Sequence, residues 1–129
     1  MSGLVAIGVG CRAGVPGEAI AALVRRALVA FGAPAGERRM FTLADKAHEP
    51  GLVEAARLIG APLIALPLEA LQAEARRVLT PSQAVQSRFG VPAIAESAAL
   101  VGAGAGGKLL GARLAADGAT CAIALSEEF

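Results

Sequence analysis

The sequence contains no Trp and no Tyr, and only four Phe among its 129 residues. Proteins that bind single-stranded nucleic acid stack the bases on aromatic side chains, and this chain offers almost none. Its formal net charge is +1, and no long run of basic residues is present. Nucleic-acid binding is therefore not expected.

Metal-ligating and redox-active side chains are also scarce. The chain has a single His and two Cys, Cys11 and Cys121, which do not form the spacing of a metal site. We therefore expect no metal and no cofactor. A disulfide between the two cysteines requires a fold that brings them together. Otherwise the chain carries free thiols, which is typical of a cytoplasmic protein.

No segment has the pattern of a secretory leader or a membrane span. The first apolar run is short and lacks a basic flank. The apolar region from Ile94 to Leu110 is broken by Glu96, Ser97 and Lys108, so it should not cross a bilayer. With 55% hydrophobic and 18% charged residues, the chain is expected to fold as one domain, residues 1–129, with no membrane partner.

Apolar periodicity and turn residues predict strands that alternate with helices. Strands are expected at residues 4–7, 39–43, 62–66, 108–114 and 120–125, and helices at 16–31, 50–59, 68–78, 80–90 and from 92 to about 102. Asp117 and Gly118 separate the last two strands, which is a strong hairpin signal. The expected fold class is α/β, with three α/β/α layers, a mixed, mainly parallel sheet and a C-terminal β-hairpin.

The stretch from Gly8 to Gly14 is the first candidate site. It lies between the first predicted strand and the first helix, where strand ends and helix N-termini converge in α/β proteins. Glycines let the backbone approach a ligand, and Arg12 supplies a planar charged fork that suits a carboxylate or phosphate. The spacing misses the dinucleotide signature G-x-G-x-x-G by one residue. The segment is either an anion-binding turn or a tight turn with a solvated arginine.

Polar residues gather in three further places. The segment from Thr42 to Gly51 again lies between a strand and a helix, and it contains Lys46, one of only two lysines against ten arginines. Thr80-Pro81-Ser82-Gln83 resembles a helix capping box. Glu96 lies inside an otherwise apolar helix, where its carboxylate either faces water or belongs to a site.

Five short motifs follow one another along the chain. They are Gly8-x-Gly10-Cys11-Arg12-x-Gly14, Thr42 with Lys46-x-x-Glu49-Pro50-Gly51-Leu52, Pro81-Ser82-x-x-Val85, Gly90-Val91-Pro92-x-Ile94-Ala95-Glu96-x-Ala98-Ala99-Leu100, and Ala119-Thr120-x-Ala122-Ile123-Ala124. This order resembles the CobE / CbiG C-terminal domain family of cobalamin biosynthesis, over nearly the whole length from Leu4 to Leu125. The resemblance implies a three-layer α/β/α fold and a role in building the corrin ring.

The resemblance also implies a form of the family. In the anaerobic pathway, the similar domain is the C-terminal half of a larger protein that opens a ring lactone and releases acetaldehyde. Here the first motif lies within ten residues of Met1. We therefore expect the stand-alone form, which is associated with the aerobic pathway.

A corrinoid partner agrees with the chemistry of these residues. Corrin intermediates are flat, apolar macrocycles edged with acetate and propionate carboxylates. Small and aliphatic side chains would accept the ring, while Arg12, Lys46 and helix N-termini meet the acid groups. A lone His48 is weak support for cobalt ligation. The ligand-binding candidates are Gly8, Gly10, Cys11, Arg12, Gly14, Thr42, Lys46, Glu49, Ser82 and Glu96.

Three functions stay open at this point. The favoured one is a corrinoid-binding carrier, or an accessory to another enzyme of the cobalamin pathway. The second is an enzyme acting on a precorrin intermediate, such as a lactone-opening hydrolase, with Lys46 and Glu49 as the acid/base pair. The third is a generic module that binds an anion or a nucleotide at the first turn. We expect residues 8–14 and 42–49 to line one cleft, joined by Pro81-Ser82 on the strength of the resemblance.

Overall fold

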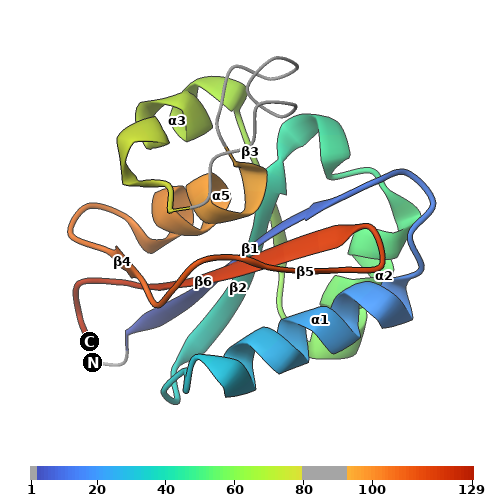
Figure 1. Cartoon of the computed structure of the whole chain (residues 1–129), viewed down its shortest axis with the longest axis horizontal. Coiled ribbons are helices and arrows are strands. Elements are labelled where there is room, and N and C mark those ends of the chain that lie inside the picture. The colour runs from blue at the N-terminus through green and yellow to red at the C-terminus, as the bar shows by residue number, and fades with distance from the viewer. Residues whose placement is uncertain (1–2, 80–92) are drawn as a thin grey trace.

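The computed structural model describes residues 3–79 and 93–129 (Figure 1). In chain order the elements are β1 (Leu4–Cys11), α1 (Gly17–Ala30), β2 (Glu37–Leu43), a 3₁₀ turn (Ala44–Lys46), α2 (Pro50–Ile59), β3 (Leu63–Leu66), α3 (Leu68–Ala73), a second 3₁₀ turn (Ala75–Arg77), α5 (Ile94–Ala103), β4 (Lys108–Leu109), β5 (Leu114–Ala116) and β6 (Ala119–Leu125). The predicted helix from Thr80 to Gly90, and with it Ser82, lies outside the described residues.

The strands of the described residues form one sheet in the order β3-β2-β1-β6-β4, and β5 also pairs with β6. β1, β2 and β3 are parallel to one another, whereas β6 is antiparallel to β1. Since β4 and β5 are antiparallel to β6, five of these six strands run in one direction. The expected mixed, mainly parallel sheet is confirmed.

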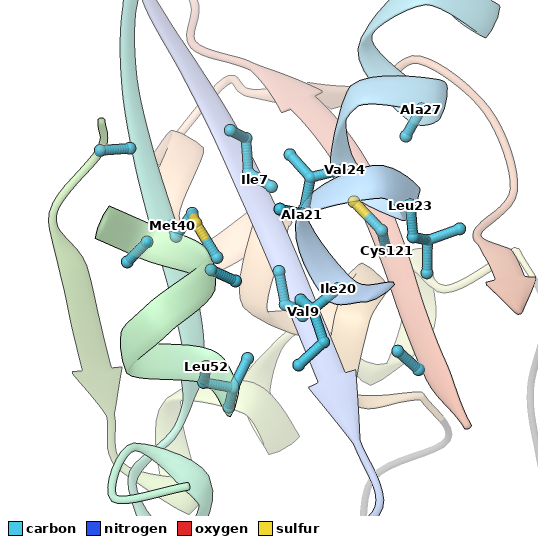
Figure 2. Packing of buried hydrophobic residues seen from close by; sticks show 14 of the residues in the cluster. Ile7, Val9, Ile20, Ala21, Leu23, Val24, Ala27, Met40, Leu52 and Cys121 are labelled. Atoms are coloured by element: carbon cyan, nitrogen blue, oxygen red, sulfur yellow. The ribbon is translucent and has the colours of Figure 1, made fainter. Parts of the chain in front are cut away.

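Helices cover both faces of the sheet, which gives the three expected layers (Figure 1). α1 and α2 pack on one face through large aliphatic side chains, among them Ile20 and Val24 of α1 against Ile7 and Val9 of β1 (Figure 2). On the other face, α5 packs through small side chains. The alanines of that layer are Ala95, Ala98, Ala99 and Ala103 of α5, and Ala6, Ala122 and Ala124 of the sheet.

The small side chains let α5 lie unusually close to β1. Gly8 is buried beneath the helix, and a Cβ there would overlap the carbonyl oxygen of Ala95 and come within 2.6 Å of the Ala99 nitrogen. The prediction that the first strand ends at Ile7 in a glycine-rich turn is therefore wrong. β1 continues to Cys11, which pairs with Ala119 of β6, and Gly8 is a packing residue inside the strand.

The elements with the clearest turn and capping residues in the sequence form where they were predicted. α2 spans Pro50–Ile59, with proline in its first turn and Gly60 at φ 78° after its end, as a left-handed C-terminal stop requires. The hairpin between β5 and β6 turns through Asp117 and Gly118, which both have positive φ, as a type I′ turn requires.

Two predicted elements are shorter than expected. The helix expected over 68–78 ends at Ala73 and continues only as the 3₁₀ turn. Of the strand expected over 108–114, only Lys108–Leu109 (β4) and Leu114, the first residue of β5, are strand residues, and β4 and β5 pair separately with β6.

Candidate functional site

A cavity of about 510 Å³ opens where β1 and β2 end, beside the N-terminus of α5 and the β5–β6 hairpin. Its size is that of a small-molecule site. The residues that line it are Gly10, Cys11, Arg12, Leu43, Lys46, Ala93, Ile94, Arg113, Ala115, Ala116, Asp117, Gly118, Ala119 and Thr120. Most of these residues are small or aliphatic, so much of the lining is apolar.

The charged side chains of the cavity are mainly positive. The charged residues among the described lining are the cations Arg12, Lys46 and Arg113 and the anion Asp117. Among residues 3–79 and 93–129, no ion pair engages Arg12 or Lys46. The backbone N–H of Arg12 donates to the carbonyl oxygen of Gly118 at 2.9 Å, which ties the loop after β1 to the hairpin turn. The cavity therefore favours an anionic ligand.

The N-terminus of α5 strengthens this preference. Ala93, the N-cap residue, lines the cavity together with Ile94, the first residue of the helix. The methyl side chain of Ala93 cannot accept a hydrogen bond from a backbone N–H of the first turn, whereas the side chains of the usual N-cap residues Ser, Asp and Asn can. The helix dipole attracts negative charge at such an end.

Cys11 is the one thiol among the described lining residues. Partial burial raises its pKa, and so does the nearby carboxylate of Glu49, while the ammonium group of Lys46 lowers it. Because the net shift is upward, the thiol is protonated at neutral pH and is a poor nucleophile.

The second cysteine lies close by on the same face of the sheet. Cys121 on β6 pairs with Val9, two residues before Cys11 on β1. Both thiols are free, and burial raises the pKa of Cys121 to about 12. The fold thus brings the two cysteines onto neighbouring strands without a disulfide.

Of the ten ligand-binding candidates, the structure places Gly10, Cys11, Arg12 and Lys46 around the cavity. The segments 8–14 and 42–49 therefore meet at one end of the sheet. Gly14 and Glu49 are not among the lining residues, but they link the same two loops, since the N–H of Gly14 donates to Glu49 Oε2 at 3.3 Å.

Thr42 and Glu96 lie deeper in the molecule. Thr42 is fully buried, and its Oγ1 donates to the carbonyl oxygen of Val9 at 2.8 Å, joining β2 to β1. Glu96 is also fully buried, so the interpretation that its carboxylate faces water is wrong. Its Oε2 accepts a hydrogen bond from the backbone N–H of Arg113 at 3.1 Å.

Arg113 and the hairpin line the cavity, although neither was predicted from the sequence to do so. The hairpin itself was predicted, but nothing in its residue types showed which way it points. For Arg113 a signal was present, because Gly111 interrupts an apolar strand two residues earlier, and glycine inside a strand often marks a bulge.

Two further observations concern the described residues as a whole. None of their helices has the length and apolar character that a membrane crossing needs. In the same part of the chain, no three or more His, Cys, Asp or Glu residues are grouped so that they could hold a metal ion.

Comparison with known proteins identifies the family. A family model described as cobalamin synthesis G C-terminus matches residues 5–124. The chain belongs to this family. One relative, protein CobE from Sinorhizobium sp, is 37% identical over 124 residues, which are 95% of this chain and 80% of the relative.

Solved structures of cobalamin proteins share the fold. The crystal structure of CobE, a protein from the cobalamin (vitamin B12) biosynthetic pathway, matches with a TM-score of 0.88 and 34% identity, covering 97% of this chain and 92% of that one. The cobalamin biosynthesis protein chiG from Agrobacterium tumefaciens gives a TM-score of 0.71 at 38% identity, with 95% and 98% covered.

A third match is more distant. A putative cobalamin biosynthesis protein G homolog from Sulfolobus solfataricus has 20% identity and a TM-score of 0.68, with 95% of this chain but only 37% of that chain covered, and it shows the shared fold alone. Membership of the cobalamin synthesis G C-terminus family confirms the resemblance drawn from the motifs and makes this a cobalamin biosynthesis protein.

Proposed function

We propose that this protein binds a corrinoid or precorrin intermediate of the aerobic cobalamin pathway, as a carrier or as an accessory to a pathway enzyme. The observation that carries the proposal is the charge of the cavity. Among the described residues, three cations and one anion accompany an otherwise mostly small and aliphatic lining at the N-terminus of α5. This combination suits a ligand that is apolar across its face and carries carboxylates at its edge.

The lining divides into two parts that match such a ligand. Leu43, Ile94 and the alanines of the hairpin offer an aliphatic surface for the ring face. Arg12, Lys46 and Arg113 come from three different segments, so they can engage more than one acid group of the same molecule. The free thiols on β1 and β6 favour the cytoplasm, the compartment in which we place this function.

We favour binding over turnover because only one residue of the acid/base pair Lys46 and Glu49 lines the cavity. Lys46 lines the cavity, but Glu49 does not, and its carboxylate already accepts the N–H of Gly14. A general base must reach the proton that it removes from a bound substrate. Glu49 is better placed to hold the two loops together.

The test compares two corrinoids that share one ring. Dicyanocobyrinic acid carries free acetate and propionate groups, and its methyl ester carries none. We expect visible absorption and calorimetry to show saturable binding of the acid and at least about tenfold weaker binding of the ester, the loss of a charge-assisted contact. Equal affinity for both corrinoids, or no binding of the acid, would contradict the proposal. A chemical change in the recovered acid, detected by chromatography, would indicate an enzyme.

A further inference from the structure

The sheet contains a bulge at the edge of the cavity. Leu109 of β4 pairs with Ala124 of β6, and Leu114 of β5 pairs with Cys121. Five positions separate the first two residues along the chain, whereas their partners are only three apart. The segment between β4 and β5 therefore has two residues more than the strand that it faces. Bulges of this kind occur beside active sites, where they turn a side chain in a new direction.

Glycine allows the bulged segment to lie close to the end of α1. A Cβ on Gly111 would come within 2.6 Å of the ring of Phe31, which is tighter than real Cβ contacts. The N–H of Leu110 still donates to Ile123 of β6 at 2.9 Å, so the bulge begins directly after that bond. At its far end lies Arg113, which lines the cavity.

A buried carboxylate holds the far end of the bulge. Glu96 in the first turn of α5 is fully buried, and its Oε2 accepts the backbone N–H of Arg113 at 3.1 Å. Burying a carboxylate is costly unless hydrogen bonds compensate it. An apolar side chain in this alanine-lined layer would avoid that cost, so a carboxylate at this position calls for a role beyond packing.

We propose that Arg113 is a specificity-determining residue of the cavity and that Glu96 is its positioning residue. The bulge carries the Arg113 backbone away from the regular ladder with β6, and Glu96 supplies the acceptor for its N–H. The guanidinium group of Arg113 thereby binds a carboxylate of the ligand. Glu96 holds Arg113 in place and does not touch the ligand. This inference rests on the proposed function, since it names the residue that selects the acid groups.

The experiment uses citrate as a small carboxylate probe, followed by NMR and calorimetry on the full chain. We expect Arg113→Met and Glu96→Met each to weaken citrate binding about tenfold, because each loses the fixed guanidinium contact. Glu96→Gln keeps an acceptor for the Arg113 N–H, so it should bind citrate close to the parent protein. Arg38→Met, an exposed arginine near the start of β2, is the matched control and should bind normally.

The decisive measurement is the double variant. If Glu96 acts only through Arg113, Glu96→Met has no further effect on citrate binding in the Arg113→Met background. A further loss there, or normal binding by Arg113→Met, overturns the proposal. Should Glu96→Met fail to fold, hydrogen exchange on the parent protein still tests it. The Arg113 amide should exchange more slowly than that of its exposed neighbour Ala112, and equal rates overturn the proposal.

Failure of this inference can be told apart from failure of the proposed function. Citrate binding that depends on Arg113, without binding of dicyanocobyrinic acid, contradicts the proposed function and supports the positioning of Arg113. Binding of dicyanocobyrinic acid that Arg113→Met leaves unchanged supports the proposed function and overturns the role of Arg113.

Discussion

Gly8 of β1 lies directly beneath Ala95 of α5, so close that a side chain on the glycine would overlap the Ala95 carbonyl oxygen. The contact fixes the height of α5 above the sheet. Since Ala93 and Ile94 at the start of this helix line the cavity, the contact also sets where the N-terminus of α5 meets a ligand.

Gly8→Ala should therefore destabilise the fold. The added methyl group meets backbone atoms of α5, which cannot rotate away, and such overpacking costs about 1–3 kcal/mol or more. Thermal and urea unfolding measure the loss. Gly14→Ala is the matched control: its φ of 82° strains a side chain, but no atom lies within 4 Å of a new Cβ, so about 1 kcal/mol is expected. Equal losses in the two variants would show that α5 is not held at this height.

This contact also shows why the sequence predicted the place of the site better than its details. Arg12 was correctly placed in a turn after the first strand, but the strand itself continues through Gly8 and Gly10, and Gly8 packs against a helix that begins some ninety residues later in the chain. Local patterns carry no information about such a partner. α2 was predicted residue by residue because Pro50 and Gly60 act locally, through the backbone angles that they allow.

The same reasoning applies to Glu96 and Arg113. A carboxylate in an Ala-rich helix has the same sequence pattern whether it faces water or a neighbouring segment, and only the packing of α5 against the sheet decides between them. Arg113 lies in a bulge, and the bulge can be recognised only from the pairing of β4 and β5 with β6, a strand that comes later in the sequence. Pairing register is a tertiary property, so it could not be predicted from the strand alone.

Thr42 provides a test that separates a ligand contact from a structural one. Its buried hydroxyl donates to the carbonyl oxygen of Val9, and it does not line the cavity. Thr42→Val keeps the branched shape but removes the donor, so the free energy of unfolding should fall by about 1 kcal/mol. Affinity for dicyanocobyrinic acid should stay unchanged. If Thr42→Val loses affinity for the corrinoid without losing stability, Thr42 contacts the ligand after all.

The two cations at the ends of β1 and β2 should affect binding more than stability. Arg12 is exposed, Lys46 is half-buried, and no ion pair among the described residues holds either of them. Arg12→Met and Lys46→Met should unfold at nearly the parent temperature, yet bind dicyanocobyrinic acid about tenfold more weakly. The exposed Arg38 again provides the control. If Arg38→Met is equally impaired, the attraction is a diffuse effect of net charge and not a contact.

Cys121 should make the fold sensitive to alkali. Burial raises the pKa of this thiol from 9.0 to about 12, so the unfolded chain releases its proton at lower pH than the folded protein does. Stability from this group is fully present below about pH 9 and is lost as the pH rises toward 12, at up to about 1.4 kcal/mol per pH unit. Unfolding temperatures measured from about pH 8 to about pH 10.5 test this, since Cys121→Ala should show a shallower decline. Parallel declines would mean that other groups cause the alkaline loss.

Cys11 reports directly on occupation of the cavity. Its thiol lies in the lining, and its raised pKa makes alkylation by iodoacetamide slow at neutral pH and faster as the pH increases. A bound corrinoid covers the thiol, so dicyanocobyrinic acid should slow alkylation of Cys11 in proportion to the fraction of protein bound. Cys121 is fully buried on the neighbouring strand, and its alkylation requires unfolding, which makes it an internal control in the same sample.

Slower modification of Cys11 alone places the ligand in the cavity. An equal slowing of both cysteines would mean only that the ligand stabilises the fold from elsewhere, and an unchanged rate at Cys11 under saturating ligand would put the binding site outside this cavity.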